Sequence, residues 1–312
     1  MKQKVLLPND IPEAGKKLLQ DAGLEVIVGS GREKETMKKE GADVSAVLIG
    51  TQEFNSEIMD AMPKLKVIAR NGVGFDSVDI EAATARGIQV VNTPESLSRS
   101  VAETVISEIL AISKNLVQNT KALEAGDWEF KRSHLGHDLA GKTLGILGFG
   151  RIGRAVAKLA KAFEMKIIAF DPYPPVVDGI EFVSREEVLR RGDYVSVHLP
   201  AIPATEKSIS TNEFALIKNS AYFINLARGS IVDEVALVRA LLNNEIAGAA
   251  LDVYEKEPLS LESPLLKLPN VLLTPHLASN TVEARERMAV DAARGIVEVM
   301  SSIKPKWAVN QL

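Results

Sequence analysis

The sequence predicts an α/β fold with two doubly wound parallel sheets. Short apolar runs of strand length alternate with helical patterns along two stretches of the chain, one before and one after residue 99. Strands that alternate with helices indicate a parallel sheet with both faces covered by helices. A further observation is the length of 312 residues, which is enough for two such domains.

The bulk composition excludes several classes of protein. Hydrophobic residues make up 46% of the chain and charged residues 25%, and the formal net charge is -4. Without a basic surplus or a run of like charges, nothing indicates a nucleic-acid partner. The absence of cysteine excludes disulfides, a thiolate nucleophile and a cysteine-ligated metal. The N-terminus lacks the features of a signal peptide and no apolar run has the length of a membrane span, which favours a soluble cytoplasmic protein without a membrane partner.

The first stretch of the chain predicts one compact domain. Its expected strands are residues 5–7, 25–28, 46–49, 67–69 and 89–91, and its expected helices include residues 14–22, 56–61 and 80–86. One further helix is expected at residues 282–300, late enough in the chain to return to this domain. We therefore expect a discontinuous domain of residues 1–98 and 282–312, and a second domain of residues 99–281.

A long helical pattern in residues 96–126 joins the two stretches. Ser100 and Glu103 have the spacing of a capping box at its start. Apolar residues lie on more than one face of this helix, so it is expected to be widely buried. It either crosses between the domains and contributes to a dimer contact, or it is an ordinary core helix; the sequence supports both interpretations equally.

A glycine-rich turn organises the second stretch. Residues 144–147 read as a buried strand, and Gly148, Gly150 and Gly153 follow with the spacing G-x-G-x-x-G before a helix. The first glycine permits a tight turn, the second lets the backbone approach a pyrophosphate, and the third lets the helix pack closely on the sheet. Further strands are expected at residues 167–170, 194–197, 222–226, 249–252 and 271–273. This pattern favours dinucleotide binding over a purely structural turn.

The predicted cofactor is NAD. Asp171 ends the second strand of the motif, where it can accept hydrogen bonds from a ribose and repel a 2′-phosphate. The predicted cofactor-binding residues are Gly148, Gly150, Arg151, Ile152, Gly153, Asp171, Thr104, His198, Ala227 and Asp252.

Three polar residues that follow strands predict the chemistry. Ligands bind beyond the carboxyl ends of parallel strands, and Arg228, Glu257 and His276 each follow such a strand. Arg228 suits a substrate carboxylate because guanidinium donates in a bidentate fork. His276 suits proton transfer near neutrality, and Glu257 would orient its ring. Taken singly, the histidine is better read as a loop residue and the glutamate as a surface charge, and the arginine fits either interpretation; their joint placement favours function.

Two other groups complete the candidates. Arg70, Asn71, Gly72, Val73 and Gly74 follow a strand of the first domain, and their backbone N–H groups could bind a substrate carboxylate. The pair His134 and His137 has a spacing that could ligate a metal, but no further ligands accompany it, so no metal site is expected.

Six segments resemble the D-isomer-specific 2-hydroxyacid dehydrogenases, particularly their phosphoglycerate dehydrogenase-like branch. They are NGVGFDSVD (71–79), NTPESLSRSVAE (92–103), GKTLGILGFGRIG (141–153), INLARGSIVDE (224–234), ALDVYEKEP (250–258) and TPHLAS (274–279). The resemblance implies a flavodoxin-like substrate domain, a Rossmann NAD-binding domain and a homodimer or larger homo-oligomer. It also implies that Arg228, Glu257 and His276 are the catalytic residues, and that Asp252 meets the nicotinamide amide. The expected reaction is hydride transfer between NAD and C2 of a small 2-hydroxy or 2-keto acid.

One departure from the family pattern bears on the substrate. Phosphoglycerate dehydrogenases usually carry an arginine where this chain has Gly50, which argues against a phosphorylated substrate, although 3-phosphoglycerate stays among the candidates. Two alternatives remain: an NAD-sensing binding protein, like the family's corepressor relatives, and a formate or phosphite dehydrogenase. The family's formate enzymes have glutamine at the position of Glu257, which speaks against the second alternative.

Overall fold

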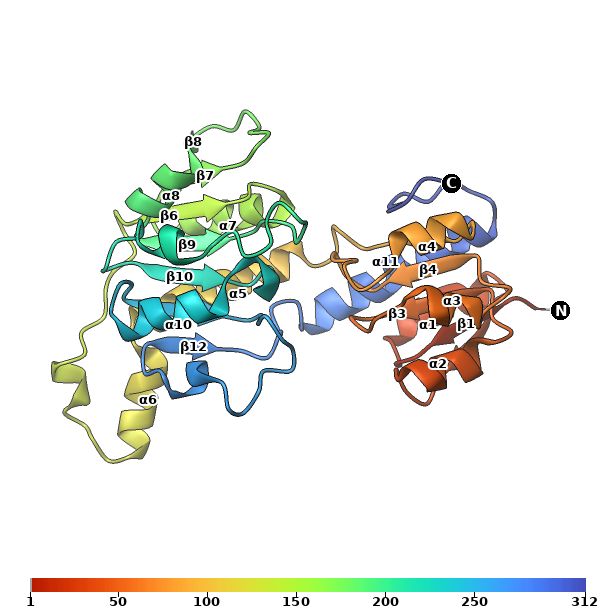
Figure 1. Cartoon of the computed structure of the whole chain (residues 1–312), viewed down its shortest axis with the longest axis horizontal. Helices are drawn as coiled ribbons and strands as arrows, with labels where there is room; N and C mark the ends of the chain where they lie inside the picture. Colours follow the sequence, from red (N-terminus) through yellow and green to blue (C-terminus); the bar gives the residue numbers. More distant parts are fainter. Residues whose placement is uncertain (1) are drawn as a thin grey trace. The chain divides into compact units, whose positions relative to one another are not determined.

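The computed structural model describes residues 2–312, which divide into two compact units (Figure 1). Unit 1 comprises the chain up to Ser98 together with Asn280–Leu312, and unit 2 comprises Arg99–Ser279. None of the helices in this described part combines the length and apolar character that crossing a bilayer requires.

Unit 1 is a five-stranded sheet in which every strand pair is parallel. Its elements are β1 (Lys4–Leu7), α1 (Glu13–Asp21), β2 (Glu25–Val28), α2 (Lys34–Gly41), β3 (Ala46–Ile49), α3 (Ser56–Asp60), β4 (Val67–Arg70), α4 (Ile80–Ala85), β5 (Gln89–Val91) and α11 (Val282–Met300). The strand order β2-β1-β3-β4-β5 is that of flavodoxin-like sheets. All five predicted strands are confirmed. The structure also contains helix α2, which was not among the helices named from the sequence.

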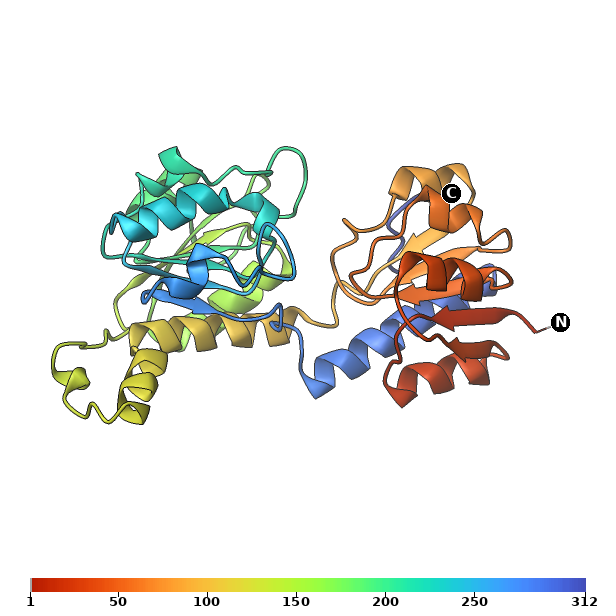
Figure 2. The same ribbon diagram turned by 60° about the horizontal axis from the view of Figure 1, so that its bottom comes forward.

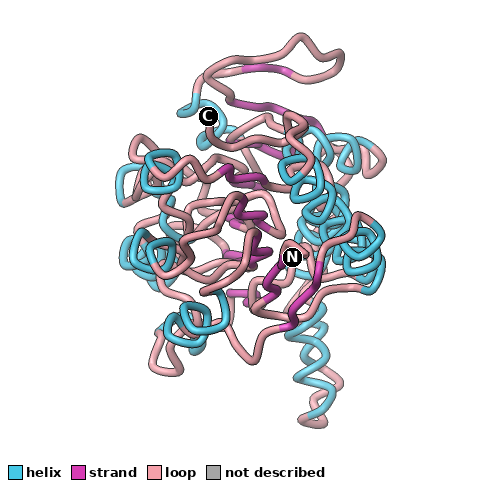
Figure 3. The backbone as a smooth tube through the Cα atoms, turned by 90° about the vertical axis from the view of Figure 1, so that its right-hand side faces the viewer, coloured by secondary structure: helices cyan, strands magenta, loops and turns pink. Residues whose placement is uncertain are grey.

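Both faces of this sheet are buried, since alternate residues of each strand enter different cores. In β3, Val47 and Ile49 join one core, while Ala46 and Leu48 join the other. The apolar runs are continuous rather than alternating for this reason. Figure 3 distinguishes the strands (magenta) from the helices (cyan) along the backbone.

The C-terminal helix α11 belongs to unit 1, and its bounds are those that the sequence predicts. Most residues of its buried face are alanine or glycine, so it approaches α1 closely: a Cβ added to Gly15 would lie 2.9 Å from the carbonyl oxygen of Ala289. The tail that follows is tied to β5, where the Asn310 side chain accepts hydrogen bonds from Gln89 Nε2 at 2.8 Å and from the Val90 N–H at 2.7 Å. Residues more than 200 positions apart thus share one core.

Unit 2 is a seven-stranded sheet, again parallel throughout. Its elements are α5 (Ser98–Ser113), α6 (Leu116–Glu124), η1 (Phe130–Arg132), β6 (Thr143–Leu147), α7 (Arg151–Lys161), β7 (Lys166–Phe170), β8 (Glu181–Phe182), α8 (Arg185–Arg191), β9 (Tyr194–Val197), α9 (Thr211–Phe214), β10 (Tyr222–Asn225), η2 (Gly229–Ile231), α10 (Glu234–Leu242), β11 (Gly248–Leu251), η3 (Pro264–Lys267) and β12 (Val271–Leu273). The strand order β12-β11-β10-β9-β6-β7-β8 reverses between β6 and β9. This switch point is where Rossmann folds bind dinucleotides. The six predicted strands are confirmed, and the seventh, β8, has only two residues, too few for a periodic pattern.

The helical pattern of residues 96–126 forms two helices rather than one. Asn115 adopts a left-handed conformation with φ 51°, and its side chain donates to the carbonyl oxygens of His134 and Leu135. Asparagine tolerates this conformation well, so the chain turns there and α6 runs in a different direction from α5 (Figure 2). The predicted capping box is wrong, because α5 already begins at Ser98 and places Ser100 inside its first turn.

Candidate active site

A histidine and a glutamate form a close pair at the carboxyl ends of two neighbouring strands of unit 2. His276 Nδ1 lies 2.6 Å from Glu257 Oε2, and each side chain is 36% exposed. Burial alone would raise the pKa of Glu257. The hydrogen bond and the charge of His276 outweigh that effect, with a smaller contribution from Arg228, and lower the pKa below its ordinary value. The glutamate is therefore a charged acceptor for the imidazole ring.

The buried Asp252, which directly follows β11, shapes the loop that carries the histidine. Its carboxylate accepts hydrogen bonds from the N–H groups of Leu277 at 2.7 Å and Ala278 at 2.8 Å, and from the Thr274 hydroxyl at 2.6 Å. Its carbonyl oxygen accepts the His276 N–H at 2.9 Å. These bonds hold His276 with φ 51°, in the left-handed region that is uncommon for residues other than glycine.

Arg228 is brought to the same place by close packing of two loops. It follows β10, and the next residue, Gly229, lies against the backbone of Tyr254, where an added Cβ would be 1.9 Å from the carbonyl carbon. Only glycine permits this approach. The half-buried Arg228 donates to the Ala227 carbonyl oxygen at 2.7 Å, and its positive charge helps to lower the pKa of Glu257. The structure thus brings the arginine, the glutamate and the histidine together within unit 2.

The glycine-rich turn between β6 and α7 leaves room for an anion. Gly148 has φ 95°, and a Cβ there would lie 2.7 Å from the carbonyl oxygen of His198. A Cβ on Gly153 would lie 2.3 Å from the carbonyl oxygen of Gly148, so α7 can pack here only with glycine. In contrast, a Cβ on Gly150 would meet no atom within 4 Å. Gly150 is the N-cap of α7, which begins with Arg151 and Ile152, so the open space adjoins a helix N-terminus, where an anion is favoured.

Asp171 lies beside this turn at the end of β7. One carboxylate oxygen accepts the Phe149 N–H at 2.8 Å, and the other accepts the Tyr173 N–H at 2.9 Å. Each oxygen keeps a lone pair for a further donor. The residue is half-buried, and these two backbone donors set its orientation.

Three further residues that were predicted to bind the cofactor form hydrogen bonds within unit 2. Ala227 donates its N–H to the Asn225 side chain at 3.1 Å, which shapes the turn before Arg228. The Thr104 hydroxyl lies 3.0 Å from the Ala278 carbonyl oxygen, so it ties α5 to the loop after His276. His198 hydrogen-bonds to Ser196 at 2.9 Å, and loss of solvent lowers its pKa to about 4, so its ring is neutral near neutral pH.

The predicted substrate loop, Arg70–Gly74, belongs to unit 1. Gly72 has φ 152°, and an added Cβ would lie 2.1 Å from Nη1 of Arg70. The Arg70 side chain is 7% exposed and donates to the carbonyl oxygen of Asn71 in its own loop. Asn92 donates to the Val73 carbonyl oxygen at 2.7 Å and fixes the far side of the loop. The part of the Arg70–Gly74 loop in substrate binding stays a prediction.

Sequence reasoning missed Glu108, a buried acid on α5. It is 4% exposed, and its Oε1 lies 2.9 Å from the hydroxyl of Thr274, two residues before His276. The available signal was a charged residue on an otherwise apolar helix face.

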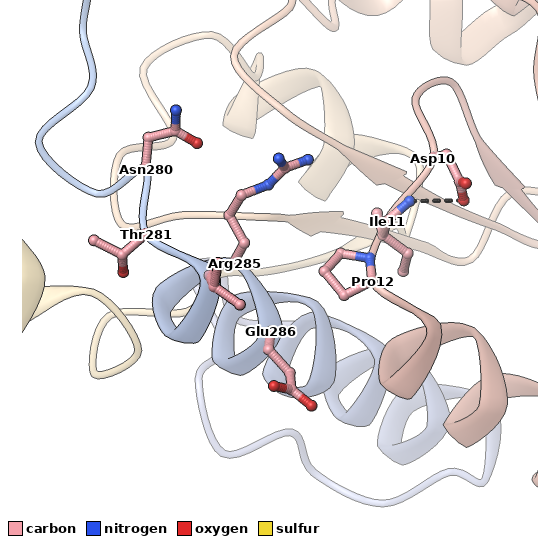
Figure 4. Close-up of a pocket in the computed structure, with 8 residues that line it drawn as sticks. Asp10, Ile11, Pro12, Asn280, Thr281, Arg285 and Glu286 are labelled. Carbon is pink, nitrogen blue, oxygen red and sulfur yellow. Dashed lines mark hydrogen bonds between the residues drawn. The ribbon is translucent and has the colours of Figure 1, made fainter.

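Two other places in the molecule contain none of the predicted site residues. His134 stacks on Phe130 with ring centroids 3.6 Å apart, and no group of three or more potential metal ligands occurs among residues 2–312. A cavity of about 590 Å³ lies in unit 1 beside the N-terminus of α11 (Figure 4). Its lining includes Asp10, Arg285 and Glu286.

Comparison with known proteins agrees with this geometry. Residues 106–278, more than half of the chain, match the family model of the D-isomer specific 2-hydroxyacid dehydrogenase NAD-binding domain. A glyoxylate reductase of Thermofilum pendens is 40% identical over 321 residues, which cover 99% of this chain and 94% of that protein. A D-3-phosphoglycerate dehydrogenase of Methanocaldococcus jannaschii is 42% identical over 313 residues, which cover 98% of this chain but 59% of that longer protein.

A solved structure extends the likeness to three dimensions. An NADPH-dependent glyoxylate/hydroxypyruvate reductase of Sinorhizobium meliloti has a TM-score of 0.89 at 33% identity, covering 99% of this chain and 97% of that one. The two parallel sheets, the glycine-rich turn at the switch point and the matched family model agree. The chain therefore belongs to the D-isomer specific 2-hydroxyacid dehydrogenase family, and it is an NAD(P)-dependent oxidoreductase that acts on the CH–OH group of 2-hydroxy acids.

Proposed function

We propose that Arg228, Glu257 and His276 are the catalytic residues of this dehydrogenase. The observation that carries the proposal is the 2.6 Å pair of His276 and Glu257 with the charge of Arg228 beside it. When bound, the nicotinamide supplies or accepts the hydride at C2 of the substrate. The protein residues handle the proton and the carboxylate.

Each residue has a distinct part in the proposed reaction. His276 uses Nε2, since Nδ1 is held by Glu257, and gives a proton to the substrate oxygen in reduction or removes it in oxidation. Glu257 keeps the ring in one orientation and stabilises its protonated form. Arg228 binds the substrate carboxylate through its bidentate fork. Absence of turnover on every 2-keto acid, despite tight NADH binding, would instead indicate an NAD-sensing protein.

We propose an unphosphorylated substrate such as glyoxylate or hydroxypyruvate. The relatives' names do not decide this, because a glyoxylate reductase and a phosphoglycerate dehydrogenase match at similar identity. The segment that follows β3 supports it: Gly50, Thr51 and Gln52 carry no positive charge for a phosphate. NADH oxidation with hydroxypyruvate and 3-phosphohydroxypyruvate provides the test, and a clear preference for the phosphorylated acid would contradict the proposal.

We propose NAD as the cofactor rather than NADP. Asp171 supports this choice, because a carboxylate next to the ribose repels a 2′-phosphate. Solved relatives include NADPH-dependent enzymes, so the preference needs a direct measurement. Titrations of protein fluorescence with NADH and NADPH should give tighter binding of NADH, and Asp171→Ala should narrow the difference by roughly tenfold. Equal affinities in the unmodified protein would contradict the proposal.

We propose that the protein forms a homodimer through α6 and the segment after it. Helix α6 extends away from the sheet of unit 2 (Figure 1), and none of its residues is buried within the chain. Large apolar side chains are exposed there: Leu116, Val117, Leu123, Trp128 and Leu135. Apolar surface of this kind favours a protein contact. A monomer by analytical ultracentrifugation would contradict the proposal.

A further inference from the structure

The buried Glu108 lies at one end of a chain of hydrogen bonds that leads to the histidine loop. The Thr274 hydroxyl oxygen lies 2.9 Å from Oε1 of Glu108 and 2.6 Å from Oδ1 of Asp252. Two residues later, His276 is held by the backbone of Asp252. All four residues belong to unit 2.

Counting protons assigns a direction to this chain. A threonine hydroxyl has one hydrogen, so it can donate to only one of its two carboxyl neighbours. Asp252 already accepts the N–H groups of Leu277 and Ala278, one on each carboxylate oxygen, and it acts on Glu108 as a negative charge. The hydroxyl therefore donates to Asp252, and the short contact with Glu108 needs a proton from the glutamate itself.

The surroundings of Glu108 favour that neutral form. The pKa of Glu108 is raised to about 8, chiefly by burial; the bond to Thr274 lowers it, and the charge of Asp252 contributes to the rise. Its other oxygen, Oε2, has no hydrogen-bond partner among the described residues. The titratable neighbours are Asp252 and Tyr254, and neither supplies a positive charge.

We propose that Glu108 is a positioning residue that, in its protonated form, donates a hydrogen bond to Thr274 and so fixes the segment that carries His276. When Glu108 loses its proton at alkaline pH, Thr274 loses a donor and Asp252 gains a charged neighbour. The loop that holds His276 is then less firmly fixed. The inference about activity rests on the proposed role of His276, whereas the protonation of Glu108 does not.

Two substitutions separate the donor from the charge. Glu108→Gln keeps an N–H donor for Thr274 but cannot ionise, and Glu108→Leu removes the donor at similar volume. Glu103→Gln is the matched control, because Glu103 lies on the same helix but is exposed and pairs with Arg99. Infrared difference spectra should contain a carboxylic acid band that disappears as the pH rises past about 8 in the unmodified protein and in the control. The band should be missing in Glu108→Gln.

Stability gives a second readout that does not depend on activity. Because the pKa of Glu108 is raised from 4.5 to about 8 on folding, its contribution is fully present below pH 4.5 and is lost as the pH rises towards 8. Tm should therefore fall more steeply with pH in the unmodified protein than in Glu108→Gln. Equal slopes, or the same titrating band in Glu108→Gln, would overturn the proposal.

Turnover then tests the positioning role. At neutral pH Glu108→Gln should turn over like the unmodified protein, and Glu108→Leu should lose at least roughly tenfold in kcat with KM little changed. At alkaline pH Glu108→Gln should retain more of its neutral-pH kcat than the unmodified protein does. Unchanged kcat in a folded Glu108→Leu would refute the positioning role. An active His276→Ala protein would instead refute the catalytic assignment, and it would leave the infrared result for Glu108 intact.

Discussion

His276 is the residue to which the proposed reaction assigns the proton transfer. Its replacement by alanine should lower kcat by roughly 100- to 10,000-fold, the range in which general acid–base catalysis contributes. NADH affinity should stay within about twofold, because the glycine-rich turn that fits the cofactor is built from other strands. Steady-state kinetics and fluorescence titration measure the two quantities. The control is His134→Ala, which lies outside the site and should behave like the unmodified protein; near-normal turnover of His276→Ala would reject the assignment.

The charge of Glu257 should appear in the rate of reduction. Its pKa is depressed, so the carboxylate stays charged as the pH falls and remains a charged hydrogen-bond partner of His276. Glu257→Gln keeps a hydrogen-bond acceptor but removes the charge, so the protonated imidazole loses support. The value of kcat/KM for reduction should fall by at least roughly tenfold at neutral pH. An unchanged kcat/KM would mean that the glutamate acts only through geometry.

At the scale of elements, two glycines of the turn between β6 and α7 allow helix packing and cofactor binding to be tested separately. Gly153→Ala would place a Cβ 2.3 Å from a backbone oxygen, and it should lower the free energy of unfolding by about 1–3 kcal/mol. Gly150→Ala enters open space, so its stability should be unchanged while NADH affinity falls by roughly tenfold. Thermal unfolding and NADH titration of the two variants provide the comparison. Unaltered NADH affinity of Gly150→Ala would argue against a pyrophosphate at this turn.

The exposed face of α6 makes a prediction about assembly. Leu123 is 57% exposed on a helix with no buried residue, so its apolar surface lacks a partner within the chain. Leu123→Asp should weaken the proposed homodimer without changing the Tm measured at low concentration, because no core contact is lost. Sedimentation at several protein concentrations measures the association. Leu261→Asp is the control: it removes exposed apolar surface elsewhere in unit 2 and should leave the association unchanged.

At the scale of the whole molecule, unit 1 depends on its two chain segments meeting. Asn310→Ala would leave the Val90 N–H without its acceptor, at a cost of about 1–3 kcal/mol, whereas Gln89 Nε2 would keep the carbonyl oxygen of residue 310 as an acceptor. Hydrogen exchange should show faster exchange in β5, with β6 and β9 of unit 2 unaffected, because each unit has its own core. Equal acceleration in both units would show that they unfold together.

Several elements were predictable because the signal was local. The five strands of unit 1, helix α11 and the glycine spacing each follow from a few adjacent residues. The two errors lie where local patterns end: the break at Asn115 depends on carbonyl groups of residues 134 and 135, and the capping box failed because α5 starts earlier. The two-residue β8 has too little sequence for any periodicity.

The sequence by itself determined the fold class, the strand positions, the dinucleotide motif and the three residues proposed for catalysis. These features depend on side-chain pattern and on the rule that ligands bind beyond the carboxyl ends of parallel strands. Only the tertiary structure decided that His276 and Glu257 lie 2.6 Å apart, that Gly229 lies against Tyr254, and that Glu108 reaches Thr274. Those contacts join residues that are far apart in the chain, and the packing of whole loops and helices sets their distances. A buried acid on an apolar helix has no local signature of its partner, which is why the sequence did not indicate its role.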